Sequence, residues 1–149
     1  MRLFTWGYQG RSLTDLIILC RRQCIDAVVD VRRFATSSQP GWNAFSLNED
    51  LGDADLAYSH LSGLGNYSKG LPWTRTDPLV VGASVRQVVS LLKKGEVLLL
   101  CRERPPKECH RLDVAAEVGR HCSCEVVHLG VSSEEVEPCS QISMFAPQG

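Results

Sequence analysis

The first thirty residues carry the pattern that most restricts the fold: an apolar run, a capped helix and a second apolar run. Residues 3–6 (LFTW) form a β-prone run that ends at a glycine-rich turn. Ser12 is followed three residues later by Asp15, the signature of a helix start, and residues 27–31 (AVVDV) form a second buried strand. A strand, a helix and a strand at this spacing predict a right-handed βαβ unit with parallel strands.

The same alternation continues along the chain. The clearest later strand covers residues 97–100, whereas residues 61–80 lack periodicity, and such a long loop is usually functional or flexible. The other predicted elements are a short helix starting at 46–49, a strand at 56–58, helices over 85–92 and 112–118, and a strand at 126–129. These elements predict an α/β fold: a single domain over residues 1–149, with a mainly parallel sheet flanked by helices in a Rossmann-like three-layer arrangement.

Composition narrows the class of protein. The net charge of −1 gives no global positive field that would hold the chain on nucleic acid. Seven cysteines are an odd number, so they cannot all pair internally. We find no leader segment, and the apolar runs are far shorter than the ~20 residues that span a bilayer. We therefore expect a cytoplasmic protein with mostly free thiols and no membrane contact; the oligomeric state is left open.

Polar residues follow the predicted strands. Tyr8 comes after the first strand, Asp30 and Arg32 end the second, and His60 follows the third. Because ligands of parallel α/β sheets bind outside the carboxyl ends of the strands, we expect these side chains to share a pocket. Asp30 and Arg32 are equally consistent with a structural ion pair. Taken alone, Tyr8 and His60 fit ordinary packing better than a functional role.

The densest cluster of reactive residues is CRERPPKECHR at 101–111, directly after the clearest strand. One interpretation is a metal site, since Cys101, Cys109 and His110 are suitable zinc ligands. The spacing disfavours it, because two cysteines separated by two residues are absent here. We therefore predict no metal residues and no cofactor, and zinc stays a secondary possibility.

Two further interpretations of this segment involve catalysis. Cys109 opens a predicted helix beside His110, a position that lowers a thiol pKa, and Cys101 at the strand end is a second candidate thiol. Alternatively, Arg32 and Arg111 bind an anionic group while Glu103 or His110 moves a proton. In the structural alternative, the adjacent prolines form a rigid turn whose charges fold over the edge of the sheet.

Several segments together resemble a known family. They are GYQGRS at 7–12, VVDVRR at 28–33, YSH at 58–60 leading to LG at 64–65, and LLLCRERPPKECHR at 98–111. This set is similar to the bacterial and archaeal family called domain of unknown function 488. The resemblance covers about residues 3–129 and leaves the tail 131–149 outside it. It implies a single α/β domain, and it implies no settled activity.

A weaker likeness is to rhodanese-type sulfurtransferases and cysteine phosphatases, in which a cysteine after a strand opens a loop that cradles an anion. Here that cysteine would be Cys101. The loop at 102–108 holds two prolines, which lack amide hydrogens, and two glutamates, which repel anions. Sulfur or phosphoryl transfer at Cys101 is therefore disfavoured.

The residues favour an enzyme that acts on an anionic ligand, a nucleotide or nucleic acid before others. The predicted catalytic residues are Cys101, Glu103, Cys109 and His110, and the predicted ligand-binding residues are Tyr8, Asp30, Arg32, His60 and Arg111. The alternatives are a non-catalytic binding or regulatory module, and a zinc-binding or thiol-dependent protein.

Overall fold

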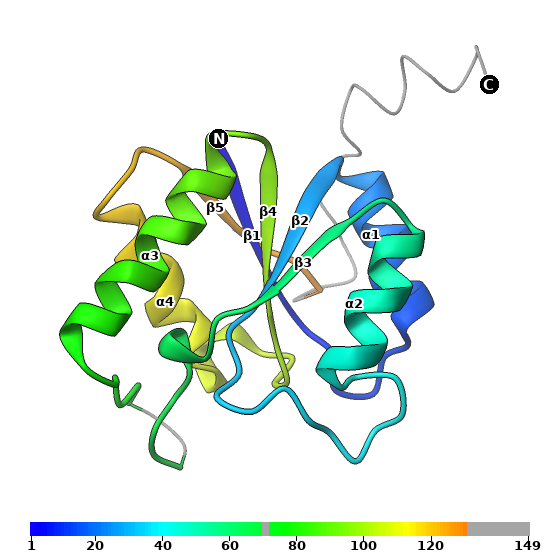
Figure 1. The fold of residues 1–149 in the computed structure, drawn as a ribbon, viewed down its shortest axis with the longest axis horizontal. Coiled ribbons are helices and arrows are strands. Elements are labelled where there is room, and N and C mark those ends of the chain that lie inside the picture. The colour runs from blue at the N-terminus through cyan, green and yellow to red at the C-terminus, as the bar shows by residue number, and fades with distance from the viewer. Residues whose placement is uncertain (70–71, 131–149) are drawn as a thin grey trace.

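The computed structural model describes residues 1–69 and 72–130. In this part of the chain, five parallel strands form one sheet in the order β3-β2-β4-β1-β5 (Figure 1). The strands are β1 (Arg2–Gly7), β2 (Ile25–Asp30), β3 (Ala57–His60), β4 (Glu96–Cys101) and β5 (Glu125–His128). The predicted α/β class is confirmed, and each strand pairing is parallel.

Helices cover both faces of the sheet, which produces the predicted three layers. Figure 1 shows α1 (Leu13–Arg22) and α2 (Ala44–Asp53) on one side, and α3 (Pro78–Leu92) and α4 (Arg111–Gly119) on the other. The inner strands are apolar on both faces for this reason: four consecutive residues of β4, 97–100, are completely buried. None of the helices in the described residues has the length and apolar character needed to cross a bilayer.

The two faces of the sheet form separate hydrophobic cores. Leu16 of α1 and Leu47 of α2 pack with Trp42 and Tyr8 in one core. In the other core, residues of α3 and α4 pack with Leu99, Cys101 and Cys109. The carboxyl edge of the sheet therefore has Tyr8 on one side and the two cysteines on the other.

The helix starts test the capping signals directly. The capping box predicted at Ser12 and Asp15 is present, and each side chain bonds the backbone N–H of the other residue. The predicted start of α2 at 46–49 is wrong by a few residues: Asn43 is the cap, and its Oδ1 accepts the Ser46 N–H at 2.9 Å. Asparagine and serine are similarly good capping residues, and here the asparagine caps the helix three residues before the serine.

The third helix begins earlier than its apolar face predicts. Asp77 caps α3, and Pro78 occupies its first turn, so the helix starts seven residues before the predicted Val85. The Asp-Pro pair is a start signal that lies inside the segment expected to be a loop. The loop at 61–80 is consequently shorter, and it also holds a 3-10 turn, Ser62–Leu64.

The order of the strands places a ligand crevice at one edge. The helix that follows β1 and the helix that follows β4 lie on opposite faces of the sheet, although β1 and β4 are neighbours. A crevice opens where adjacent strands send their connections to opposite faces, at the carboxyl ends of those strands. The ends of β1, β2 and β4 meet there.

Candidate functional site

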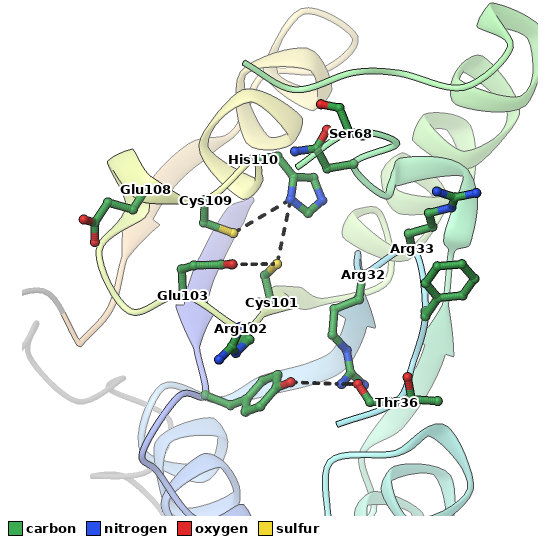
Figure 2. Close-up of a pocket in the computed structure, with 13 residues that line it drawn as sticks. Arg32, Arg33, Thr36, Ser68, Cys101, Arg102, Glu103, Glu108, Cys109 and His110 are labelled. Atoms are coloured by element: carbon green, nitrogen blue, oxygen red, sulfur yellow. Dashed lines mark hydrogen bonds between the residues drawn. The ribbon is translucent and has the colours of Figure 1, made fainter. Parts of the chain in front are cut away.

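A pocket of about 350 Å³ lies at the carboxyl ends of β1, β2 and β4 (Figure 2). Its lining residues are Tyr8, Arg32, Arg33, Phe34, Thr36, Asn66, Ser68, Cys101, Arg102, Glu103, Glu108, Cys109 and His110. The convergence predicted for the strand ends thus includes Tyr8, Arg32 and the segment after β4. Asp30, His60 and Arg111 are not among the lining residues.

The four predicted catalytic side chains lie together after β4. The Cys101 thiol donates to Glu103 Oε2 at 3.7 Å, and its Sγ lies 3.8 Å from His110 Nδ1. Cys109 Sγ lies 3.9 Å from the same Nδ1 (Figure 2). The two Sγ atoms and a ring nitrogen of His110 all lie within 4.8 Å of one another, so they could hold a metal ion. A 3-10 turn, Pro106–Glu108, brings the two cysteines together, which their separation in sequence does not reveal.

The orientation of His110 is fixed by the backbone of β2. Its Nε2 lies 2.8 Å from the carbonyl oxygen of Val31. A carbonyl only accepts hydrogen bonds, so Nε2 carries the proton and Nδ1 faces the two sulfur atoms. His110 is 6% exposed and lies 6.3 Å from the Trp73 ring, centroid to centroid.

The backbone of the loop after β4 is bonded to the strand beside it. The N–H groups of Tyr8 and Gln9 donate to the carbonyl oxygens of Cys101 and Arg102 at 3.0 and 2.9 Å. Gly7 makes this approach possible, because a Cβ at that position would lie 1.8 Å from the carbonyl oxygen of Glu103. In GYQG, the lack of a side chain on Gly7 therefore lets the loop close, and Gly10 adopts a positive φ of 73°, which favours glycine.

Arg111 supports the same loop from within the protein. Its side chain is completely buried, and its guanidinium donates to the carbonyl oxygens of Glu103 and of Arg104, the latter at 2.7 Å. Its backbone N–H points at Cys109 Sγ at 3.5 Å. In this arrangement Arg111 fixes the loop that carries Glu103.

Asp30 and Arg32 form a buried, two-pronged ion pair. Arg32 Nε and Nη2 donate to the two carboxylate oxygens at 2.8 and 2.6 Å, and the Tyr58 hydroxyl donates to the same carboxylate at 2.7 Å. Arg32 Nη1 lies 2.7 Å from the Trp42 carbonyl oxygen and 3.3 Å from the Tyr8 hydroxyl. The structural interpretation of this pair therefore accounts for most of its donors and acceptors.

Tyr8 and His60 lie around this ion pair. Tyr8 stacks on Trp42 with ring centroids 4.5 Å apart, and it lines the pocket. His60 Nε2 bonds the carbonyl oxygen of Arg32 at 2.7 Å. His60 thus fixes the backbone just after β2. His110 does the same one residue earlier, because its Nε2 bonds the carbonyl oxygen of Val31.

The two cysteines shift each other's pKa in opposite directions. The hydrogen bond with Cys109 and then burial raise the pKa of Cys101, while the same bond lowers the pKa of Cys109. Burial disfavours a charge on His110, but its contact with the Cys109 sulfur outweighs this and raises its pKa. Burial raises the pKa of Glu103. These opposite shifts favour a negative charge on Cys109, beside the imidazole, over one on Cys101.

The structure adds pocket residues that the sequence analysis did not select. Arg33 and Arg102 are exposed, and the Arg33 guanidinium lies over the rings of Phe34 and Tyr67, 4.8 and 4.4 Å from their centroids. Asn66, Ser68 and Thr36 are the other additions. The two adjacent arginines of VVDVRR could have indicated this role for Arg33. Neighbouring residues at a strand end point in different directions, so when Arg32 is buried Arg33 is exposed.

The Leu-Gly pair at 64–65 also gains a structural role. Leu64 is completely buried, and a Cβ on Gly65 would lie 2.4 Å from the Cα of Arg33. The Trp73 indole N–H donates to the Gly65 carbonyl oxygen at 3.1 Å. The loop after β3 is thereby held against the end of β2, which places Asn66 and Ser68 at the pocket.

Comparison with known proteins supports the resemblance seen in the motifs. Neither curated proteins nor solved structures gave a match. A family model covers residues 12–118, a range that includes the end of β2, the loop after β3 and the whole cluster after β4. The chain belongs to the family described as Domain of unknown function DUF488.

Proposed function

We propose that this protein is an enzyme that acts on a nucleotide, with Glu103 as the group that moves a proton. The observation that carries the proposal is that Glu103 faces a pocket together with two thiols and an imidazole, while arginines form its walls. His110 is less suited to proton transfer, because its Nε2 is bonded to Val31 and its Nδ1 faces the sulfur atoms.

The proposed anion-binding residues are Arg33 and Arg102. Both are exposed and line the pocket, and within the described residues neither forms an ion pair. Arg32 also lines the pocket, but its charge is paired with Asp30 and its donors are directed at Asp30 and backbone carbonyls. Guanidinium groups suit phosphate because they donate two parallel hydrogen bonds.

Aromatic and polar residues favour a nucleotide over a simple anion. The Phe34 side chain is 65% exposed beside Arg33, so it offers a surface on which a base can stack. Asn66 and Ser68 provide hydrogen-bonding groups on the wall formed by the loop after β3. The volume of about 350 Å³ is near the lower end of the range for small-molecule pockets, which fits one nucleotide.

Binding is tested by calorimetry with the four ribonucleoside monophosphates, inorganic phosphate and a short single-stranded oligonucleotide. We expect at least one nucleotide probe to bind, and Arg33→Ala or Arg102→Ala to weaken it about tenfold, since bonds to charged groups contribute about 1.5–3 kcal/mol. The matched control is Arg86→Ala, an exposed arginine of α3. Absence of binding by every probe, or an equal loss in the control, would contradict the proposal.

Turnover separates an enzyme from a binding module. The same probes are incubated with the protein and analysed by mass spectrometry for products. We expect Glu103→Gln to keep nucleotide affinity within about twofold and to lose product formation by a factor of about 100 or more, the usual contribution of a positioned acid or base. Binding without any product would instead identify a non-catalytic module.

A further inference from the structure

We propose that Cys101, Cys109 and His110 bind a zinc ion on the floor of the pocket. The three side chains are 3%, 2% and 6% exposed, and their ligand atoms lie within 4.8 Å of one another. Thiolate sulfur and imidazole nitrogen are the ligands that zinc prefers, whereas magnesium and calcium prefer oxygen. The zinc site lies in the same pocket as the proposed nucleotide site, but the zinc proposal does not require that a nucleotide binds there, so it can be tested separately.

The distances between the imidazole nitrogen and the two sulfur atoms are close to those of a tetrahedral centre. With Zn–S near 2.3 Å and Zn–N near 2.0 Å, the sulfur and nitrogen ligands of a tetrahedral zinc are about 3.6 Å apart. Here Nδ1 of His110 lies 3.8 Å from one sulfur and 3.9 Å from the other. Both of these distances exceed the tetrahedral value by only a few tenths of an ångström. The two sulfur atoms lie within 4.8 Å of each other, and a tetrahedral zinc would hold them about 3.8 Å apart.

The surroundings orient the ligands as they do around known zinc sites. A histidine ligand usually donates its second ring N–H to a carbonyl or carboxylate, and His110 does so to Val31 at 2.8 Å. The backbone N–H of Arg111 points at Cys109 Sγ, where it stabilises a thiolate. Since the Val31 bond keeps the proton on Nε2, the lone pair of Nδ1 is directed at the sulfur atoms.

Three protein ligands leave a fourth position for water or substrate, as in catalytic zinc sites. All three residues line the pocket, so the fourth position faces it. Glu103 lies on the same side, with Oε2 3.7 Å from Cys101 Sγ. A carboxylate placed there can accept a proton from a zinc-bound water, which zinc makes more acidic. We assign Glu103 to the neighbourhood of the metal and not to its ligand set, because only the ligand atoms of Cys101, Cys109 and His110 all lie within 4.8 Å of one another.

The direct test is the metal content of the full chain, purified without chelators or a histidine tag and analysed by plasma mass spectrometry. We expect one zinc per chain, and about none in Cys101→Ala, Cys109→Ala or His110→Ala. The matched control is Cys122→Ala, a half-buried cysteine outside the pocket, which should retain the metal. Glu103→Gln should also retain it, and loss of zinc there would refute the open fourth position.

A second measurement uses only the wild-type protein, so it does not depend on the folding of the variants. Adding cobalt to the metal-free chain should produce thiolate-to-metal charge-transfer absorption, and zinc should abolish it. Zinc should also protect Cys101 and Cys109, but not Cys122, from iodoacetamide. If the reconstituted chain holds no metal and the pocket thiols alkylate equally with and without zinc, the site is a reactive thiol pair and the proposal is wrong. Nucleotide affinity measured on the metal-free chain keeps this outcome separate from the proposed function.

Discussion

Two polar clusters lie at the same edge of the sheet, and they differ in how completely their groups are bonded. Around the end of β2, Asp30 and Arg32 form hydrogen bonds of 2.6–2.8 Å with each other and with Tyr58 of β3. At the end of β4, the contacts of Cys101 with Glu103 and His110 are 3.7 and 3.8 Å long and involve sulfur. The polar groups of the first cluster are bonded to one another, whereas those of the second cluster can still bond a ligand.

This difference indicates that the β2 cluster stabilises the edge of the sheet, whereas the β4 cluster forms the candidate site. A buried ion pair that is fully hydrogen-bonded resists rearrangement, because each broken bond leaves a charge without solvent. The cluster after β4 has weakly bonded side chains on a firmly held backbone, which Gly7 and Arg111 keep in place. Reactive groups held in this way are preorganised without being neutralised. Four substitutions test this contrast through the free energy of unfolding.

The largest expected effect is that of Asp30→Asn. The substitution leaves the Arg32 guanidinium buried without its counter-charge, and such breaks cost about 3–5 kcal/mol. Urea unfolding followed by tryptophan fluorescence measures the loss. A cost below about 1 kcal/mol would show that the β2 cluster is not the rigid part of the edge.

Tyr58→Phe tests one bond of the same cluster. It removes the hydroxyl that donates to Asp30 at 2.7 Å, and bonds to charged groups contribute about 1.5–3 kcal/mol. Tyr67→Phe is the matched control, because that hydroxyl bonds the Ser62 carbonyl oxygen at an exposed position. Equal losses in the two variants, measured in the same urea titration, would count against a special role for the Asp30 network.

Gly7→Ala tests the backbone that supports the β4 cluster. The added methyl would collide with the Glu103 carbonyl, and forced repacking of this kind costs about 1–3 kcal/mol. The control is Gly52→Ala in α2, where nothing lies within 4 Å and alanine should stabilise the helix by up to about 1 kcal/mol. The melting temperature should therefore fall in Gly7→Ala and rise in Gly52→Ala, and thermal melting of the two variants tests this.

Glu103→Gln should have the smallest effect on stability. Its carboxylate contacts a thiol at 3.7 Å and is half-buried, so we expect a change within about 0.5 kcal/mol. Burial raises the pKa of this carboxyl, so its ionisation disfavours the folded state, and the folded wild type loses stability as pH rises through that pKa. The variant should therefore equal or slightly exceed the wild type at pH 7. A loss above about 2 kcal/mol in urea would mean that Glu103 is part of the scaffold.

Much of the fold could be predicted from the sequence, because its signals are local. The run at 97–100 and the pair Ser12 and Asp15 fix a strand and a helix start within a few residues of sequence. The starts of α2 and α3 were misplaced because Asn43 and Asp77 cap them, and a cap is hard to distinguish from any other polar residue in a loop. The order of the strands depends on long-range pairing that no local pattern contains.

The sequence predicts part of the pocket lining, and it predicts the geometry of the pocket less well. Cys101, Glu103, Cys109 and His110 do share one pocket, as their place after a strand indicated. Their spacing argued against a metal, since it could not show that the turn at Pro106–Glu108 brings the two sulfur atoms together. The direction of the Arg111 guanidinium depends on which backbone carbonyls lie within reach, and only the three-dimensional structure supplies that information.

The lengths of the strands bear on how the molecule behaves at high concentration. β3 and β5, at the two edges of the sheet, have four residues each, whereas β1, β2 and β4 have six. A short edge presents few backbone groups to which a strand from another molecule could pair. β5 also begins with the exposed charge of Glu125, which opposes the approach of a second sheet. The most aggregation-prone segment, residues 97–100, is shielded at the centre of the sheet and becomes a hazard only on unfolding.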